Sequence, residues 1–129
     1  MRPTIVLLSP PGDHEVVVAR LQGAGTYEKD AILGRVFRGD CLFGVDFTGD
    51  VLDDFSEEEV DEIRNRIGDF RAVMLEYSSV PCVRDLLLGV LQGVSGVLDT
   101  NYGEMITYGE VLERFRADPL WDWRSVIPE

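Results

Sequence analysis

The stretch AILGRVFRGDCLFGVDF, residues 31–47, decides the fold class of this chain. Its two halves, Ala31 to Phe37 and Cys41 to Phe47, are rich in the aliphatic and aromatic residues that favour β-strands. Arg38-Gly39-Asp40 between them is a short turn with a glycine, so we expect the two runs to pair as a β-hairpin. A hairpin places an antiparallel pair in the middle of the chain and disfavours a purely parallel sheet.

A clear helix start follows the hairpin. Ser56 and Glu59 have the spacing of a capping box, in which each side chain satisfies a free backbone donor of the other residue. Gly68 is a typical helix end. The apolar positions between them share one face of the predicted helix: Val60, Ile63 and Ile67.

The same kinds of signal predict the remaining elements. Asp13, Ser79 and Thr107 are the expected N-caps of three further helices. The other predicted elements are strands at 4–8, 70–77, 96–100 and 104–106, and helices at 14–22, from 80 to about 94, and from 108 to about 116.

The resulting order is β-α-β-β-α-β-α-β-α. It predicts an α+β fold: a mixed β-sheet of four to six strands with a central antiparallel hairpin and helices packed on it. A ferredoxin-like core with an added helix, strand and helix would satisfy this order, and a small doubly wound sheet is the second choice. The length of 129 residues, 45% of them apolar, predicts one domain spanning 1–129 with a proper core.

Charge excludes several classes of function. The chain has 24 acidic and 12 basic residues and a net charge of −12, which argues against binding to nucleic acid or to an anionic membrane surface. Apolar runs such as Ile5 to Leu8 are far too short to span a membrane, and we read no secretion signal. We expect Cys41 and Cys82 to be reduced, buried thiols, and therefore a cytoplasmic location.

The acids are concentrated in one segment. Residues 53–62 contain seven acids and no base, and the apolar stripe of the predicted helix turns most of them toward solvent. Such a dense patch of one sign repels itself, so it is either a solubilising face or a docking surface for a basic partner. Aromatic residues near turns and in the C-terminal tail often anchor interfaces, although they also pack back on the fold. The candidate partner-binding residues are Asp53, Asp54, Glu57, Glu58, Asp61, Glu62, Tyr102 and Trp121.

Catalytic and metal chemistry have weaker signals. His14 is the single histidine, and Cys82 stands at a predicted helix start, where a thiol pKa is lowered, but without a second cysteine two residues on. The acids around Asp46 and Asp50 lack the spacing of a calcium loop. Residues 99–104 come closer to that spacing but also read as an ordinary turn. We predict no catalytic residue, metal ligand or cofactor.

In size and charge the chain is similar to small acidic α/β inhibitors and immunity proteins that neutralise basic toxins, a resemblance that involves no matching sequence motif. We therefore predict a small acidic cytoplasmic binding module that docks a basic protein partner, with a nuclease-type toxin as one candidate. Two alternatives stay open: a small enzyme that uses Cys82 or an acidic cluster, and an oligomeric ligand-binding domain with a pocket at Asn101 to Glu104. The sequence predicts no particular oligomeric state.

Overall fold

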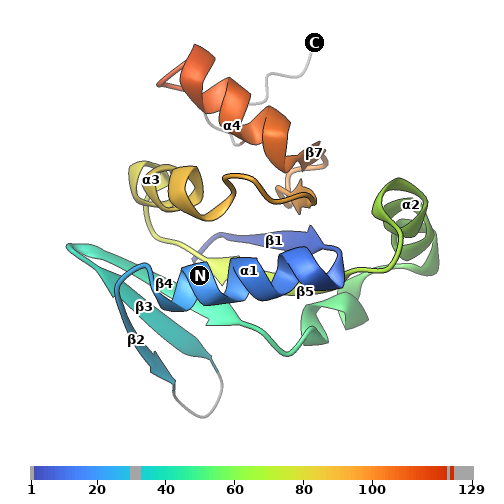
Figure 1. Ribbon diagram of the computed structural model, residues 1–129, viewed down its shortest axis with the longest axis horizontal. Helices are drawn as coiled ribbons and strands as arrows, with labels where there is room; N and C mark the ends of the chain where they lie inside the picture. Colours follow the sequence, from blue (N-terminus) through green and yellow to red (C-terminus); the bar gives the residue numbers. More distant parts are fainter. Residues whose placement is uncertain (1, 30–32, 122, 124–129) are drawn as a thin grey trace.

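The computed structural model describes residues 2–29, 33–121 and 123 of the chain (Figure 1). Its elements are β1 (Thr4–Ser9), α1 (Pro11–Gln22), β2 (Thr26–Lys29), β3 (Gly34–Arg38), β4 (Cys41–Asp46), the 3₁₀ helix η1 (Asp50–Asp54), α2 (Glu57–Ile67), β5 (Arg71–Glu76), α3 (Val80–Val90), β6 (Val97–Asp99), β7 (Met105–Thr107) and α4 (Tyr108–Ala117). The strands form one sheet in the order β2-β3-β4-β5-β1-β6-β7. Within these described ranges, no helix is long and apolar enough to cross a membrane.

The predicted α+β class is confirmed, and the predicted hairpin appears as the antiparallel pair β3–β4, while residues 31 and 32 lie outside the described residues. Two details differ from the prediction. The sheet has seven strands instead of four to six, because the polar segment TYEK also pairs, as β2 along β3. Every pairing of the described strands is antiparallel, so the sheet is not mixed. A doubly wound sheet is not found, because it needs neighbouring strands that are parallel. The strands β4, β5, β1 and β6, joined through α1 and α3 on one face, have the order and the antiparallel pairing of a ferredoxin-like core, in which β4 and β5 take the place of the predicted hairpin.

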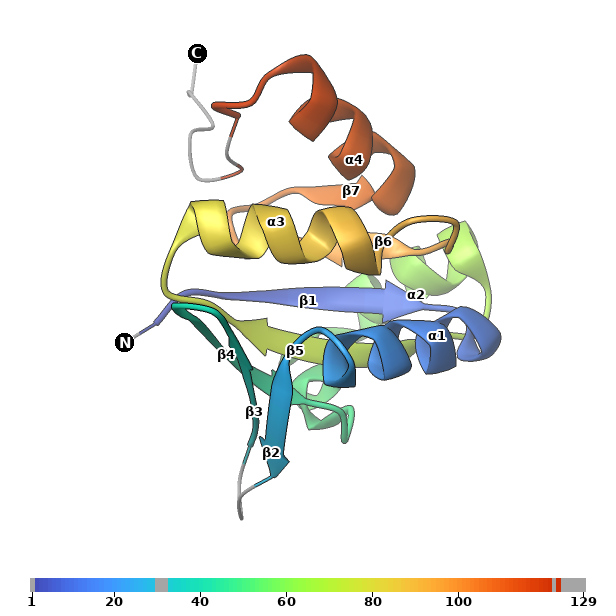
Figure 2. The same ribbon diagram turned by 60° about the vertical axis from the view of Figure 1, so that its left-hand side comes forward.

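Helices lie on both faces of the sheet (Figures 1 and 2). Helices α1, α3 and α4 pack on one face, and α2 with η1 packs on the other. Strand β1 supplies both hydrophobic layers: Ile5 and Leu7 point to the first, and Val6 and Leu8 point to the second. The hydrophobic cluster under α2 contains no residue of β2, β3 or β4. Helix α2 therefore covers the second face only over β1, β5 and β6.

The predicted helix caps are formed in three cases out of four. The amide of Glu59 donates to the Ser56 hydroxyl at 3.1 Å, and the amide of Ser56 donates to the Glu59 carboxylate at 2.9 Å, which completes the capping box. Ser79 and Thr107 also accept from the backbone of their helices. Asp13 does not cap α1, which begins earlier, at Pro11, because proline at the first helical position has its φ already set for the helix.

The prediction of reduced cysteines is wrong. Cys41 at the start of β4 and Cys82 in the first turn of α3 form a disulfide, with a Cα–Cα distance of 5.8 Å. The two residues are 41 positions apart, and both pack against the hydrophobic cluster that α1, α3 and α4 share with the sheet. The bond ties the β3–β4 hairpin to α3, and it leaves no free cysteine in the chain.

The first prediction concerns the capping box. Replacing Ser56 by alanine leaves the amide of Glu59 without its acceptor, so Ser56→Ala should lower the free energy of unfolding by about 1 kcal/mol. Urea denaturation measures this change. Ser78→Ala, at an exposed serine outside any helix, is the matched control and should leave the midpoint unchanged. Equal midpoints for the two variants would contradict a cap at Ser56.

The second prediction concerns the disulfide. Closing a loop of this length reduces the entropy of the unfolded chain, so the double variant Cys41→Ser, Cys82→Ser should lose about 4 kcal/mol of unfolding free energy. Denaturation of the wild type with and without a reducing agent gives an independent measurement. The reduced wild type should have the same denaturation midpoint as the double variant. If the reducing agent leaves the denaturation midpoint of the wild type unchanged, this bond does not stabilise the fold.

Candidate functional site: an acidic groove beside helix α2

The acids of α2 lie on two flanks of the helix, separated by the apolar stripe that faces the sheet. Glu58 and Glu62 are one turn apart on one flank, and Glu57 and Asp61 are one turn apart on the other. All four side chains are exposed. Like charges at this spacing repel each other by roughly 0.2–0.5 kcal/mol per pair, so this arrangement does not favour the helix itself.

One flank of α2 forms a wall of a groove, and the turn between β6 and β7 forms the opposite wall. The groove has a volume of about 450 Å³. Its lining residues are Glu59, Glu62, Arg66, Asp99, Asn101, Gly103, Glu104 and Met105. Because four carboxylates and one guanidinium line it, we call it the acidic groove.

The turn that forms the second wall is held by its own side chains. Asn101 has a left-handed backbone with φ of 64°, and its amide donates to the Asp99 carboxylate at 2.9 Å. Its side-chain amide reaches back to β1 and donates to the Thr4 carbonyl at 2.8 Å. The Thr100 hydroxyl donates to the Glu104 carbonyl at 3.1 Å. The carboxylates on this wall are therefore placed by a fixed backbone.

Asp99 is the most perturbed acid of the groove. Burial raises the pKa of its half-buried carboxyl group, the amide of Asn101 lowers it, and the Glu59 carboxylate across the groove raises it again, with a net rise. A carboxylate with a raised pKa is one whose charge is poorly compensated. A cation entering the groove would therefore be favoured at this position.

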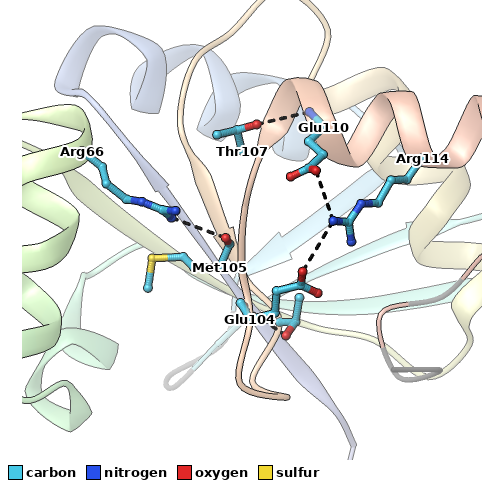
Figure 3. Close-up of polar contacts among 7 residues, drawn as sticks. Arg66, Glu104, Met105, Thr107, Glu110 and Arg114 are labelled. Atoms are coloured by element: carbon cyan, nitrogen blue, oxygen red, sulfur yellow. Dashed lines mark hydrogen bonds and ion pairs between the residues drawn. The ribbon is translucent and has the colours of Figure 1, made fainter. Parts of the chain in front are cut away.

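Two arginines show how guanidinium groups already bind at this site (Figure 3). Arg66 reaches from α2 and donates to the Met105 carbonyl at 3.4 Å. Arg114 reaches from α4 and contacts the carboxylates of Glu104 at 3.5 Å and Glu110 at 3.1 Å. The surface at the start of β7 thus offers backbone carbonyls and carboxylates to planar cationic groups, which is the pattern that arginine recognises best.

The predicted contact residues divide between the groove and its surroundings. Glu62 lines the groove, and Tyr102, which is 49% exposed, lies in the turn between two groove residues. Glu57 and Asp61 line a smaller hollow, of about 260 Å³, on the other flank of α2. Asp53 and Asp54 are exposed on η1, directly before α2, and line neither.

Trp121 lies outside the groove and packs back on the fold. The Arg114 guanidinium stacks over its indole at 5.2 Å from the ring centroid, and Arg84 donates to its carbonyl at 2.8 Å. Its ring also contacts Phe115 and Trp123. Trp123 is fully buried and donates to the Tyr77 hydroxyl at 3.0 Å. A contact role for Trp121 stays a prediction. The residue is half-buried, so only part of its side chain is available to a partner.

Sequence reasoning did not place Asp99 and Glu104 in the same site as α2. The sequence indicates a turn with acids at residues 99–104 and an acidic helix after Ser56, but it does not indicate that the two lie together. They are more than 30 residues apart, and their proximity depends on β6 pairing with β1 and on α2 packing over the same strand. The local signal that was available is the run Asp99-Thr100-Asn101, which is typical of a self-bonded turn.

The other candidates for chemistry, His14 and Cys82, lie outside the acidic groove. Cys82 is held in the disulfide and has no free thiol. Burial, with a smaller contribution from Arg71, lowers the pKa of His14. Within the described residues, no group of three or more His, Cys, Asp and Glu side chains is arranged to hold a metal ion.

Comparison with known proteins adds no family to this description. No protein-family model, curated protein or solved structure matches the chain. The site is therefore interpreted from its own geometry.

The third prediction concerns Asp99. The raised pKa means that ionised Asp99 destabilises the folded state once the pH exceeds that pKa. Asp99→Asn keeps the acceptor for Asn101 and removes the charge, so it should raise the thermal midpoint at neutral pH. The difference should shrink as the pH falls through the pKa of Asp99, because the wild-type carboxyl then also becomes neutral. Asp69→Asn, at an exposed acid outside the groove, is the control. A difference that is independent of pH would contradict the raised pKa.

Proposed function

We propose that the chain is a binding module that docks a basic protein partner through the acidic groove and the exposed acids of η1 and α2. The observation that carries this proposal is the meeting of two acidic segments around one groove. Glu59 and Glu62 come from α2, and Asp99 and Glu104 come from the turn after β6. Scattered solubilising charges would not need a shared, preformed concavity.

The proposed docking combines long-range attraction with a specific contact. The net charge of −12 and the concentration of acids in residues 53–62 attract a basic surface from a distance and raise the association rate. The groove then accepts an arginine or lysine side chain of the partner close to Asp99. Tyr102, an exposed aromatic residue between the lining residues Asn101 and Gly103, would supply a surface against which the stem of that side chain packs.

Inhibition is the form of this function that we favour, as in an immunity protein that neutralises a toxin. Enzymes that act on nucleic acid carry clustered cations, because they must contact phosphates. An acidic surface that covers those cations competes directly with the nucleic acid and blocks activity without touching a catalytic residue.

The predicted cytoplasmic location stays a prediction. Its argument from reduced cysteines no longer holds, because disulfides such as Cys41–Cys82 are rare in reducing compartments. Blocking free thiols during cell lysis and then measuring the mass of the protein would show whether the bond exists in the native compartment.

The fourth prediction tests the docking surface. The triple variant Glu58→Lys, Asp61→Lys, Glu62→Lys should slow association with the basic partner by at least about tenfold at low salt, because steering charges act on the association rate. The matched control is Glu15→Lys, Asp40→Lys, Glu113→Lys, which changes the net charge equally at exposed positions on α1, the β3–β4 turn and α4. Surface plasmon resonance with the partner immobilised measures both rates.

The partner is obtained by capture from the native host with wild-type, triple-variant and control proteins. The proposal requires a basic protein that is retained by the wild type and the control and lost with the triple variant. Its association rate with the wild type should fall as salt rises, since charges are screened over about 8 Å at physiological ionic strength. A captured partner that binds the α2 variant and the control variant equally, or that binds independently of salt, would show that the acids of α2 are not part of the docking surface.

A further inference from the structure

The second face of the sheet is open over β2, β3 and β4. The hydrophobic cluster under α2 ends at β5, and Figure 2 shows no described helix over the outer side of these three strands. Strand alternation and the pairing register place one set of side chains on this face. We call it the open sheet face, formed by Glu28, Arg35, Phe37, Leu42, Gly44 and Glu76.

The open sheet face carries an apolar projection beside a hollow. Phe37 is a large hydrophobic side chain with 38% exposure, and it lies opposite Leu42 in the β3–β4 register. Gly44 lies two residues further along β4, between Arg35 and Glu76, and the Glu76 side chain lies over it. A hollow of about 220 Å³ lies there. Its lining includes Leu42, Gly44 and Glu76.

The charges on this face are of both signs, unlike the acidic surface beside α2. The Arg2 guanidinium lies 3.6 Å from the Glu76 carboxylate, and Glu28 lies opposite Arg35 in the β2–β3 register. Each of these two arginines therefore has an acid beside it. Two molecules that each carry a net charge of −12 repel each other when they approach through most orientations. The open sheet face is a surface where two copies can meet with opposite charges adjacent.

We propose that two copies of the chain form a symmetric dimer through their open sheet faces. A two-fold axis lets the same patch serve on both copies, so Phe37 of each copy packs beside Leu42 at the hollow of the other.

The fifth prediction tests this dimer with the complete chain. Sedimentation velocity over a range of concentrations should show a monomer–dimer equilibrium for the wild type. Phe37→Asp should raise the dissociation constant of the dimer by about a hundredfold or more, because two buried phenylalanines are lost and two unpaired charges are gained. The control is Val16→Asp, at a hydrophobic residue on α1 with the same 38% exposure, and it should dimerise like the wild type. Phe37→Ala is the milder variant and should weaken the dimer without adding charge.

The response to salt distinguishes the proposed dimer from the docking of a basic partner. Screening reduces the repulsion between two acidic copies, so the dimer should strengthen as salt rises, whereas docking of a basic partner should weaken. The triple variant of α2 should still dimerise. A wild type that remains monomeric up to concentrations on the order of 1 mM, or a Phe37→Asp variant that dimerises like the wild type, would overturn the proposed dimer. Neither result would affect the proposed docking function.

Discussion

Strand β1 has side chains buried on both faces of the sheet, and most of the structure is organised around this double burial. Four consecutive residues, Ile5 to Leu8, are almost completely buried, and alternate members enter the two hydrophobic clusters. The strand pairs with β5 on one side and β6 on the other, so its backbone groups bond within the sheet. At its end, the Ser9 hydroxyl lies 2.6 Å from the buried hydroxyl of Tyr108 at the start of α4, which links the strand to the last helix.

The acidic groove depends on the same strand. Val6 of β1 faces Asp99 in the register with β6, and Val6 belongs to the hydrophobic cluster that receives Ile63 of α2. Both walls of the groove, the helix and the turn, are therefore placed by contacts with β1. Asn101 adds a direct tie, since its side chain bonds the Thr4 backbone. This common support keeps carboxylates that repel one another in fixed positions.

What the sequence could predict was local. The capping box at Ser56 and the caps at Ser79 and Thr107 depend on residues three positions apart, and all three are formed as expected. The pairing of β2, the disulfide and the groove each join segments that are distant in the chain or carry a weak local signal. TYEK has little apolar alternation, and its strand conformation comes from its pairing with β3. No spacing rule indicates that Cys41 faces Cys82, because one lies on a strand and the other on a helix.

The acids of α2 differ in what they contribute to the fold, and this difference supports their assignment to a docking surface. Glu59 completes the capping box, and the acids of the first turn interact favourably with the helix dipole. Glu62 gains nothing comparable, because it lies one turn later, one turn from Glu58, and faces the groove. Asp99 is also unfavourable for the fold, since it is half-buried near Glu59 and its pKa is raised. Charges that weaken a fold and converge on one concavity are expected where binding compensates for their repulsion, since proteins depart from local rules mainly at functional sites. A basic side chain placed in the groove beside Glu59 and Asp99 would offset the repulsion between its two walls.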